Sequence, residues 1–100
     1  MICAVASSNV SLEDMHKLID KAALEARLSR EKNLVIVILA PNTKEVFKYR
    51  DAFTKYIDLG VRLYYDNNVE KMQKLLSNCK KIFCLQNDAQ KLNISNAICI

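Results

Sequence analysis

The sequence predicts a small α/β domain in which a mainly parallel sheet of four or five strands lies between two layers of helices. Three observations lead to this prediction. The run from Leu34 to Ala40 is apolar throughout, which is typical of a strand buried on both faces. Strand-like and helix-like segments alternate along the chain, as in βαβ crossover units. The 100 residues are close to the commonest size of one domain, so we expect a single domain, 1–100.

The first strand and the first helix are expected at residues 2–6 and from Ser11 to about Glu31. Residues 2–6 are a short apolar segment. The Ser11 hydroxyl can accept a hydrogen bond from a first-turn amide and so begin a helix. Apolar residues then recur at steps of three and four, which gives this helix one buried stripe: Leu12, Met15, Leu18, Ile19, Ala22, Ala23 and Ala26.

The second strand is expected at 34–40 and a second helix at 44–59. The β-branched residues of the 34–40 run favour a strand, and Pro41 ends it. Thr43 is expected to cap the second helix, which we expect to run unbroken from Lys44 to Leu59. Its inner stripe is taken from the apolar and aromatic positions at helical spacing: Val46, Phe47, Tyr49, Phe53, Tyr56 and Ile57.

The remaining segments continue the alternation. We expect a third strand at 61–65, a shorter helix at 69–78 and a fourth strand at 81–85. A polar connection with room for one helical turn follows at 86–93, and residues 97–100 are expected to form a fifth strand at the edge of the sheet. This order is that of a minimal flavodoxin-like or Rossmann-like three-layer sandwich.

Composition and charge exclude several classes of protein. Apolar residues make up 51% of the chain and charged residues 26%, which is ordinary for a globular domain and not for a disordered one. The N-terminus lacks the pattern of a secretory signal, and the run 34–40 is too short to cross a membrane. We therefore expect a cytoplasmic protein with no membrane partner. The net charge of +4 permits an acidic partner without requiring one.

Polar residues follow the strands at the edge where ligands bind in open parallel sheets. They are Ser7, Ser8 and Asn9 after the first strand, Asn42 and Thr43 after the second, Asp66, Asn67 and Asn68 after the third, and Gln86, Asn87 and Asp88 after the fourth. These residue types cap helices in any α/β protein, so capping alone is one interpretation. The other is capping together with ligand binding, either of a small anion at free helix amides or of Mg²⁺ between Asp66 and Asp88.

Motifs for catalysis and for cofactors are missing from the sequence. With one glycine, the chain has neither a phosphate-binding loop nor a dinucleotide fingerprint. Its one histidine, His16, is expected on the first helix, away from the polar rim, where it has no partner for acid–base chemistry. We therefore predict no cofactor. The sequence leaves open whether the protein is an enzyme, and a protein without catalytic activity is favoured.

Four cysteines leave three interpretations open. Cys3, Cys84 and Cys99 lie within expected strands, where free thiols behave as small hydrophobic groups. The second interpretation is a disulfide, of Cys3 with Cys84 or of Cys79 with Cys99, which would suit an intracellular protein of a hyperthermophile. A zinc site is the third and the least favoured, because no Cys-x-x-Cys pair is present.

We consider three hypotheses for the function of the protein. The first is a non-catalytic binding or regulatory module that forms a homodimer through the edge of the last strand, Ala97 to Ile100. The second is nucleic-acid binding, because aromatic residues alternate with cations along the second helix and third strand; its candidate contacts are Lys44, Lys48, Arg50 and Lys55. The third is a small metal-dependent phosphoesterase or nuclease that uses Asp66 and Asp88.

Two resemblances to known families involve the middle of the chain. The segment from Leu59 to Asp66 resembles the Gly-Val-x-Val-x-x-x-Asp passage of phospholipase-D-like domains, although their His-x-Lys motif has no counterpart here. That resemblance implies a non-catalytic relative. The run of alternating helices and strands is similar to small ribosomal RNA-binding domains, whose glycine-rich contact loop is also missing.

Overall fold

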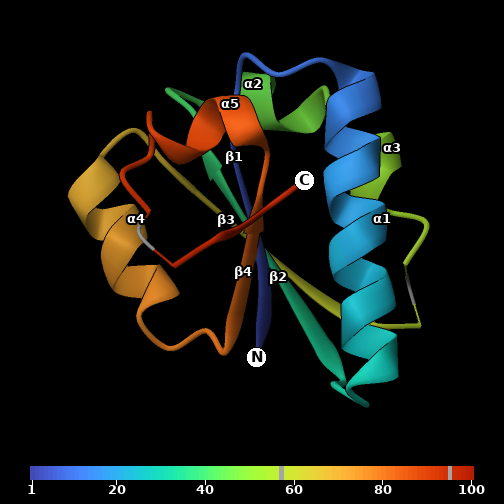
Figure 1. Cartoon of the computed structure of the whole chain (residues 1–100). Coiled ribbons are helices and arrows are strands. Elements are labelled where there is room, and N and C mark those ends of the chain that lie inside the picture. The colour runs from blue at the N-terminus through green and yellow to red at the C-terminus, as the bar shows by residue number, and fades with distance from the viewer. Residues whose placement is uncertain (57, 95) are drawn as a thin grey trace.

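A computed structural model of the chain describes residues 1–56, 58–94 and 96–100. These residues form five strands and five helices. The strands are β1 (Ile2–Ser7), β2 (Asn33–Leu39), β3 (Gly60–Asp66), β4 (Lys81–Cys84) and β5 (Ile98–Cys99). The helices are α1 (Leu12–Leu28), α2 (Thr43–Phe47), α3 (Arg50–Phe53), α4 (Val69–Leu76) and α5 (Gln86–Ala89). One helix follows each of β1, β3 and β4, and two short helices follow β2 (Figure 1).

The strands form one sheet in the order β3-β2-β1-β4-β5, and every neighbouring pair is parallel. This confirms the predicted α/β class and the fifth, edge strand. β2 lies between β1 and β3, as expected for the apolar run 34–40, and its residues Leu34 to Ile38 are buried. β1 is more central still, with all six residues buried.

Two hydrophobic cores lie on the two faces of the sheet. On one face, Ile2, Ala4 and Ala6 of β1 and the even-numbered residues of β2 pack against α1 and the α2–α3 segment. On the other face, Cys3 and Val5 pack with residues of α4 and of the segment after α5. Alternate residues of a strand point to opposite faces, so both faces need a cover. Figure 1 shows α1 and α3 on one side of the strands and α4 on the other.

α1 forms as its sequence predicts. The Ser11 hydroxyl accepts a hydrogen bond from the Asp14 amide at 3.1 Å, and the apolar stripe from Met15 to Ala26 is buried. The outer Leu12 stays 44% exposed. The helix ends at Leu28, three residues before the expected end, because the chain turns at Arg30 with a positive φ of 57°.

The prediction of one unbroken helix from Lys44 to Leu59 is wrong. Two short helices, α2 and α3, replace it, and Asn42 rather than Thr43 is the N-cap of α2. At the break, the Tyr49 amide bonds to the Val46 carbonyl and the Ala52 amide bonds to the Tyr49 carbonyl. These three-residue steps tighten the backbone and turn the Tyr49 side chain into the core, where it is 1% exposed. Ile57, expected on the inner stripe, lies outside the described residues.

Within the described residues, none of the helices combines the length and the apolar character that a membrane crossing requires.

Candidate functional site

The chain changes direction across the sheet between β1 and β4. The strands β2 and β3 extend the sheet on one side of β1, and β4 and β5 extend it on the other. The connections leave the carboxyl ends of β1 and β4 toward opposite faces, to α1 and to α5. In open α/β sheets this topological switch point leaves a crevice in which ligands bind. Of the rim predicted from the sequence, the part between the carboxyl ends of β1 and β4 is therefore the preferred position for a ligand.

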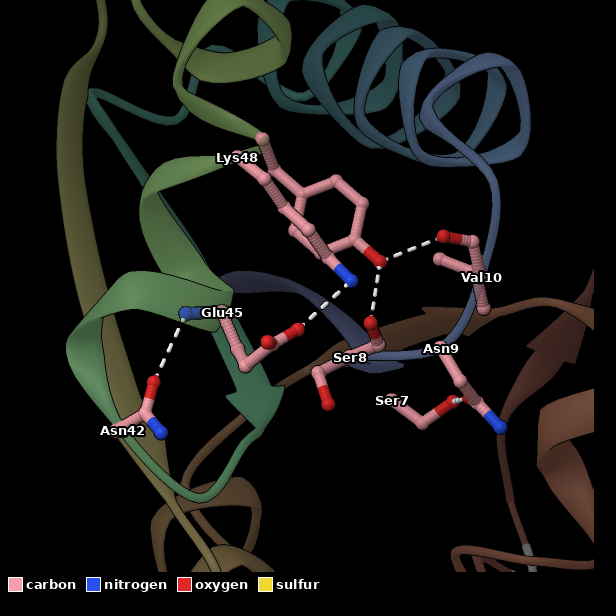
Figure 2. A network of polar contacts seen from close by, with 8 residues as sticks. Ser7, Ser8, Asn9, Val10, Asn42, Glu45 and Lys48 are labelled. Atoms are coloured by element: carbon pink, nitrogen blue, oxygen red, sulfur yellow. Dashed lines mark hydrogen bonds and ion pairs between the residues drawn. The ribbon is translucent and has the colours of Figure 1, made fainter.

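A buried carboxylate connects the two strand ends. Asp88, in α5, is 3% exposed. Its carboxylate accepts a hydrogen bond from the Ser7 amide at 3.2 Å and another from the Ser7 hydroxyl at 2.8 Å. The Ser7 hydroxyl oxygen also contacts the side chain of Asn9 (Figure 2). A buried carboxylate is costly unless it is paired in this way, so Ser7 and Asp88 hold each other in place.

A cleft of about 360 Å³ opens beside this pair. The loop after β1 and the first turn of α1 form one wall, and α5 with the residue Lys91 forms the other. The chemistry of the lining is mixed, with three side-chain amides, two carboxylates and one ammonium group: Asn9, Gln86 and Asn87; Asp14 and Asp88; and Lys91. Such a surface can donate and accept hydrogen bonds on several sides of a small molecule.

The first turn of α1 is a poor anion site. Glu13 and Asp14 place negative charge there, and the Asp14 amide is already bonded to Ser11. Acidic side chains at this position occupy the positive end of the helix dipole that an anion would need. The cleft therefore suits a neutral or amine-bearing polar molecule better than the small anion considered from the sequence.

Tyr49 supports the loop that forms one wall of the cleft. Its hydroxyl lies 2.8 Å from the Ser8 carbonyl and 2.6 Å from the Val10 carbonyl, and it shares its one proton between these two oxygens. Burial raises the pKa of the Tyr49 phenol, so the hydroxyl keeps its proton for this bond. The sequence placed Tyr49 on a buried stripe but gave no sign of the role of its hydroxyl.

Of the other predicted rim residues, Asn42 and Asn68 cap helices. The Asn42 side chain accepts from the Glu45 amide at 3.1 Å, next to the Lys48–Glu45 ion pair (Figure 2). Thr43 is the first residue of α2. At the end of β3, Asp66 accepts from the Asn68 amide, and Asn68 accepts from the amides of Glu70 and Lys71. Asn67 is exposed beside them.

Asp66 and Asp88 do not form a metal site together. β3 and β4 are separated by β2 and β1, and three strand spacings amount to roughly 14 Å. One Mg²⁺ binds its oxygen ligands at about 2 Å, so it cannot bridge these carboxylates. Among the described residues, no group of three or more His, Cys, Asp and Glu side chains is arranged to hold a metal ion.

The basic residues named from the sequence lie on the α2–α3 side of the molecule, and two of them are paired with acids. Lys48 bonds to Glu45 at 2.9 Å, and this bond raises the pKa of the Lys48 ammonium. Lys55 lies 2.8 Å from Asp20. Lys44 and Arg50 are exposed. Nucleic-acid binding by these four residues stays a prediction.

The cysteines pair differently from both disulfides considered in the sequence. Cys3 is bonded to Cys79, with a Cα–Cα distance of 6.2 Å. Cys79 lies in the turn before β4, where the Lys80 amide bonds to the Met1 carbonyl and brings this turn to the start of β1. Cys84 and Cys99 are free thiols on the neighbouring strands β4 and β5, with their sulfur atoms 3.9 Å apart. Burial, and then the contact with Cys99, raise the pKa of Cys84 to about 12.

Comparison with known proteins supports the fold. No family model matches the chain, and no curated protein matches it; neither resemblance noted in the sequence gains support. A crystal structure of a hypothetical protein from Sulfolobus tokodaii is similar to this chain, with a TM-score of 0.64 and 24% sequence identity. The similarity covers 97% of this chain and 87% of that one. It shows a shared α/β fold and carries no information on activity.

Proposed function

We propose that this protein is a non-catalytic binding module that holds a small polar molecule in the cleft between the carboxyl ends of β1 and β4. The observation that carries the proposal is the buried Asp88 carboxylate, bonded twice to Ser7 at the switch point of the sheet. Ser7 holds the Asp88 carboxylate, which lines the cleft, in a fixed position, and fixed polar groups are what orient a ligand in a pocket.

The composition of the cleft favours a neutral or amine-bearing ligand that is rich in hydrogen-bonding groups. Asn9, Gln86 and Asn87 are exposed amides on its walls. The cleft lining holds one ammonium group, Lys91, against two carboxylates, Asp14 and Asp88. Catalysis through Asp66, Asp88 and a shared metal ion has no support from this geometry, so a metal-dependent phosphoesterase is not our proposal.

The test is a titration of the isotope-labelled protein followed by amide chemical shifts. The probes are adenosine, D-ribose, L-glutamine and, as the anionic comparison, inorganic phosphate. We expect one of the uncharged or zwitterionic probes to shift the amides of Asn9, Asn87 and their neighbours. The Asn87→Ala variant should abolish these shifts, and the matched variant Asn67→Ala, an exposed asparagine after β3, should leave them unchanged. Shifts produced by phosphate alone would refute the proposed ligand class.

We also propose that the module forms a homodimer through the edge of the last strand. β5 is the outer strand of the sheet, and Ile98 and Ile100 are 43% and 39% exposed. Unpaired strand edges with exposed apolar side chains favour pairing with a second chain. Sedimentation velocity should show a dimer that Ile98→Lys dissociates. A monomer at high protein concentration would remove this part of the proposal. The cytoplasmic location expected from the sequence stays a prediction.

A further inference from the structure

A groove of about 540 Å³ lies between the edge strand β3 and α4. Arg62 and Tyr64 pair in register with Val35 and Val37 of β2, which belong to the core on the α4 face. Alternate strand residues share a face, so Arg62 and Tyr64 both point toward this groove. No further strand lies beyond β3 in the sheet of the described residues, so the groove is accessible from that side.

The groove carries an excess of positive charge. Arg62 from β3 and Lys71 and Lys74 from α4 line it, and all three are exposed. Within the described parts of the chain, none of these three cations forms an ion pair. Asp66 is the one acidic residue that lines the groove, and its carboxylate accepts the Asn68 amide at the end of β3. This differs from the α2–α3 side, where Lys48 and Lys55 are neutralised by acids.

An aromatic side chain is located among these cations. Tyr64 lines the groove and is 39% exposed, so part of its ring is accessible to a ligand there. Exposed aromatic rings beside cations are the pattern by which proteins stack unpaired bases and hold the adjoining phosphates. A base inside a double helix is already stacked on its neighbours and cannot use such a ring.

We propose that the groove formed by Arg62, Tyr64, Lys71 and Lys74 binds single-stranded nucleic acid. Tyr64 stacks on a base, and the three cations contact the phosphates on either side of it. This site is separate from the cleft of the proposed function, because β3 lies two strands away from β1 and the groove is formed by α4 rather than α5. If a test shows no binding at one of the two sites, the proposal for the other site still stands.

The test is the binding of a fluorescently labelled uridine oligomer of about ten nucleotides, a length within the usual site size, followed by anisotropy between about 50 mM and 200 mM salt. Three phosphate contacts predict a slope of about −2 for log K against log salt, and Lys74→Ala should reduce it to about −1.4. Tyr64→Leu should weaken binding roughly 5- to 150-fold, the loss expected for one stacked base, with an unchanged slope.

Two control variants separate this groove from other surfaces. Tyr65→Leu changes the same residue type on the same strand, but on the opposite face, where Tyr65 pairs in register with Ile38. Lys17→Ala removes an exposed cation from α1, which covers the opposite face of the sheet. Both should bind the oligomer like the unchanged protein. Circular dichroism of every variant confirms that its fold is intact.

Three results would overturn the proposal. The first is no binding at about 50 mM salt, where contacts with phosphates are strong. The second is an equal loss with Tyr65→Leu and Tyr64→Leu. The third is displacement of the oligomer by an oligoglutamate peptide of equal charge, together with full binding by Tyr64→Leu. This last result would assign the groove to acidic peptides instead.

Discussion

The Asp88 carboxylate accepts two hydrogen bonds from Ser7, a residue 81 positions earlier in the chain. One comes from the Ser7 backbone amide and one from its hydroxyl. The two residues meet because β1 and β4 are neighbours in the sheet. They join the loop that leads into α1 to the short helix α5, and so hold together the two walls of the cleft.

Removing the Asp88 carboxylate is expected to destabilise the protein. In Asp88→Ala the Ser7 amide loses its acceptor in a buried position, which costs about 1–3 kcal/mol. Asp88→Asn keeps one acceptor oxygen and should lose less. Urea unfolding, monitored by circular dichroism, measures both changes. An Asp88→Ala protein as stable as the unchanged chain would show that the pair does not hold the walls together.

Tyr49→Phe removes one hydroxyl and leaves the ring in the core. The carbonyls of Ser8 and Val10 then lose their donor, and we expect the free energy of unfolding to fall by about 0.5–1.5 kcal/mol. Amide exchange should become faster for the loop after β1, because this bond attaches the loop to the α2–α3 segment. Tyr65→Phe is the matched control, and an exposed change of this kind should stay within about 0.5 kcal/mol.

The bond between Cys3 and Cys79 is expected to provide a large part of the stability. It joins residues 76 positions apart, and the entropy of closing a loop of that length corresponds to roughly 4 kcal/mol. Cys79→Ser, or reduction of the unchanged protein, should lower the free energy of unfolding by about this amount. Urea titrations with and without a reductant measure the difference. Equal midpoints in the two titrations would contradict the expectation.

Tyr56 should titrate at unusually high pH. Burial, and then its hydrogen bond to the Asp20 carboxylate, raise the pKa of Tyr56 to about 12, against about 10 in an unfolded chain. Between these two values the unfolded chain has lost this proton and the folded protein has kept it, so stability falls as the pH rises. The contribution of Tyr56 is complete below about pH 10.

Tyrosinate absorbance during an alkaline titration measures this pKa. Asp20→Asn removes the carboxylate that keeps the phenol protonated, so the high-pH transition should move to lower pH. Lys55, which lies 2.8 Å from Asp20, offers a second check. The Lys55→Met variant leaves Asp20 in place, and the transition should then stay well above pH 10. If Asp20→Asn titrates like the unchanged protein, the bond between Tyr56 and Asp20 does not form in solution.

Segments with an unambiguous pattern were predictable. The apolar run 34–40 is typical of a strand that is buried on both faces, and β2 is such a strand. The stripe of α1 needs one apolar partner surface, which the sheet supplies. The polar residues after β1 and β4 were expected at the same edge, and Ser7 and Asp88 do meet there.

Features that depend on distant contacts were not predictable. At the break, the Tyr49 hydroxyl bonds to carbonyl acceptors about 40 positions earlier in the chain, and no local pattern shows that contact. Strand order also has no local signal. Without the strand order, Asp66 and Asp88 could be taken as neighbours on the rim, and the disulfide partner of Cys3 could not be identified as Cys79. The crossing from β3 past β2 and β1 to β4 decides both questions.

The Cys3–Cys79 bond divides the chain into a covalent ring and a tail. The ring contains β1 to β3 with α1 to α4, and the tail contains β4, α5 and β5. A protease that cuts one peptide bond inside the ring leaves a single molecule, whose halves separate only when a reductant is added. A cut just after Cys79 instead leaves the fragment that carries Asp88, and with it one wall of the cleft, attached to the ring by non-covalent contacts alone.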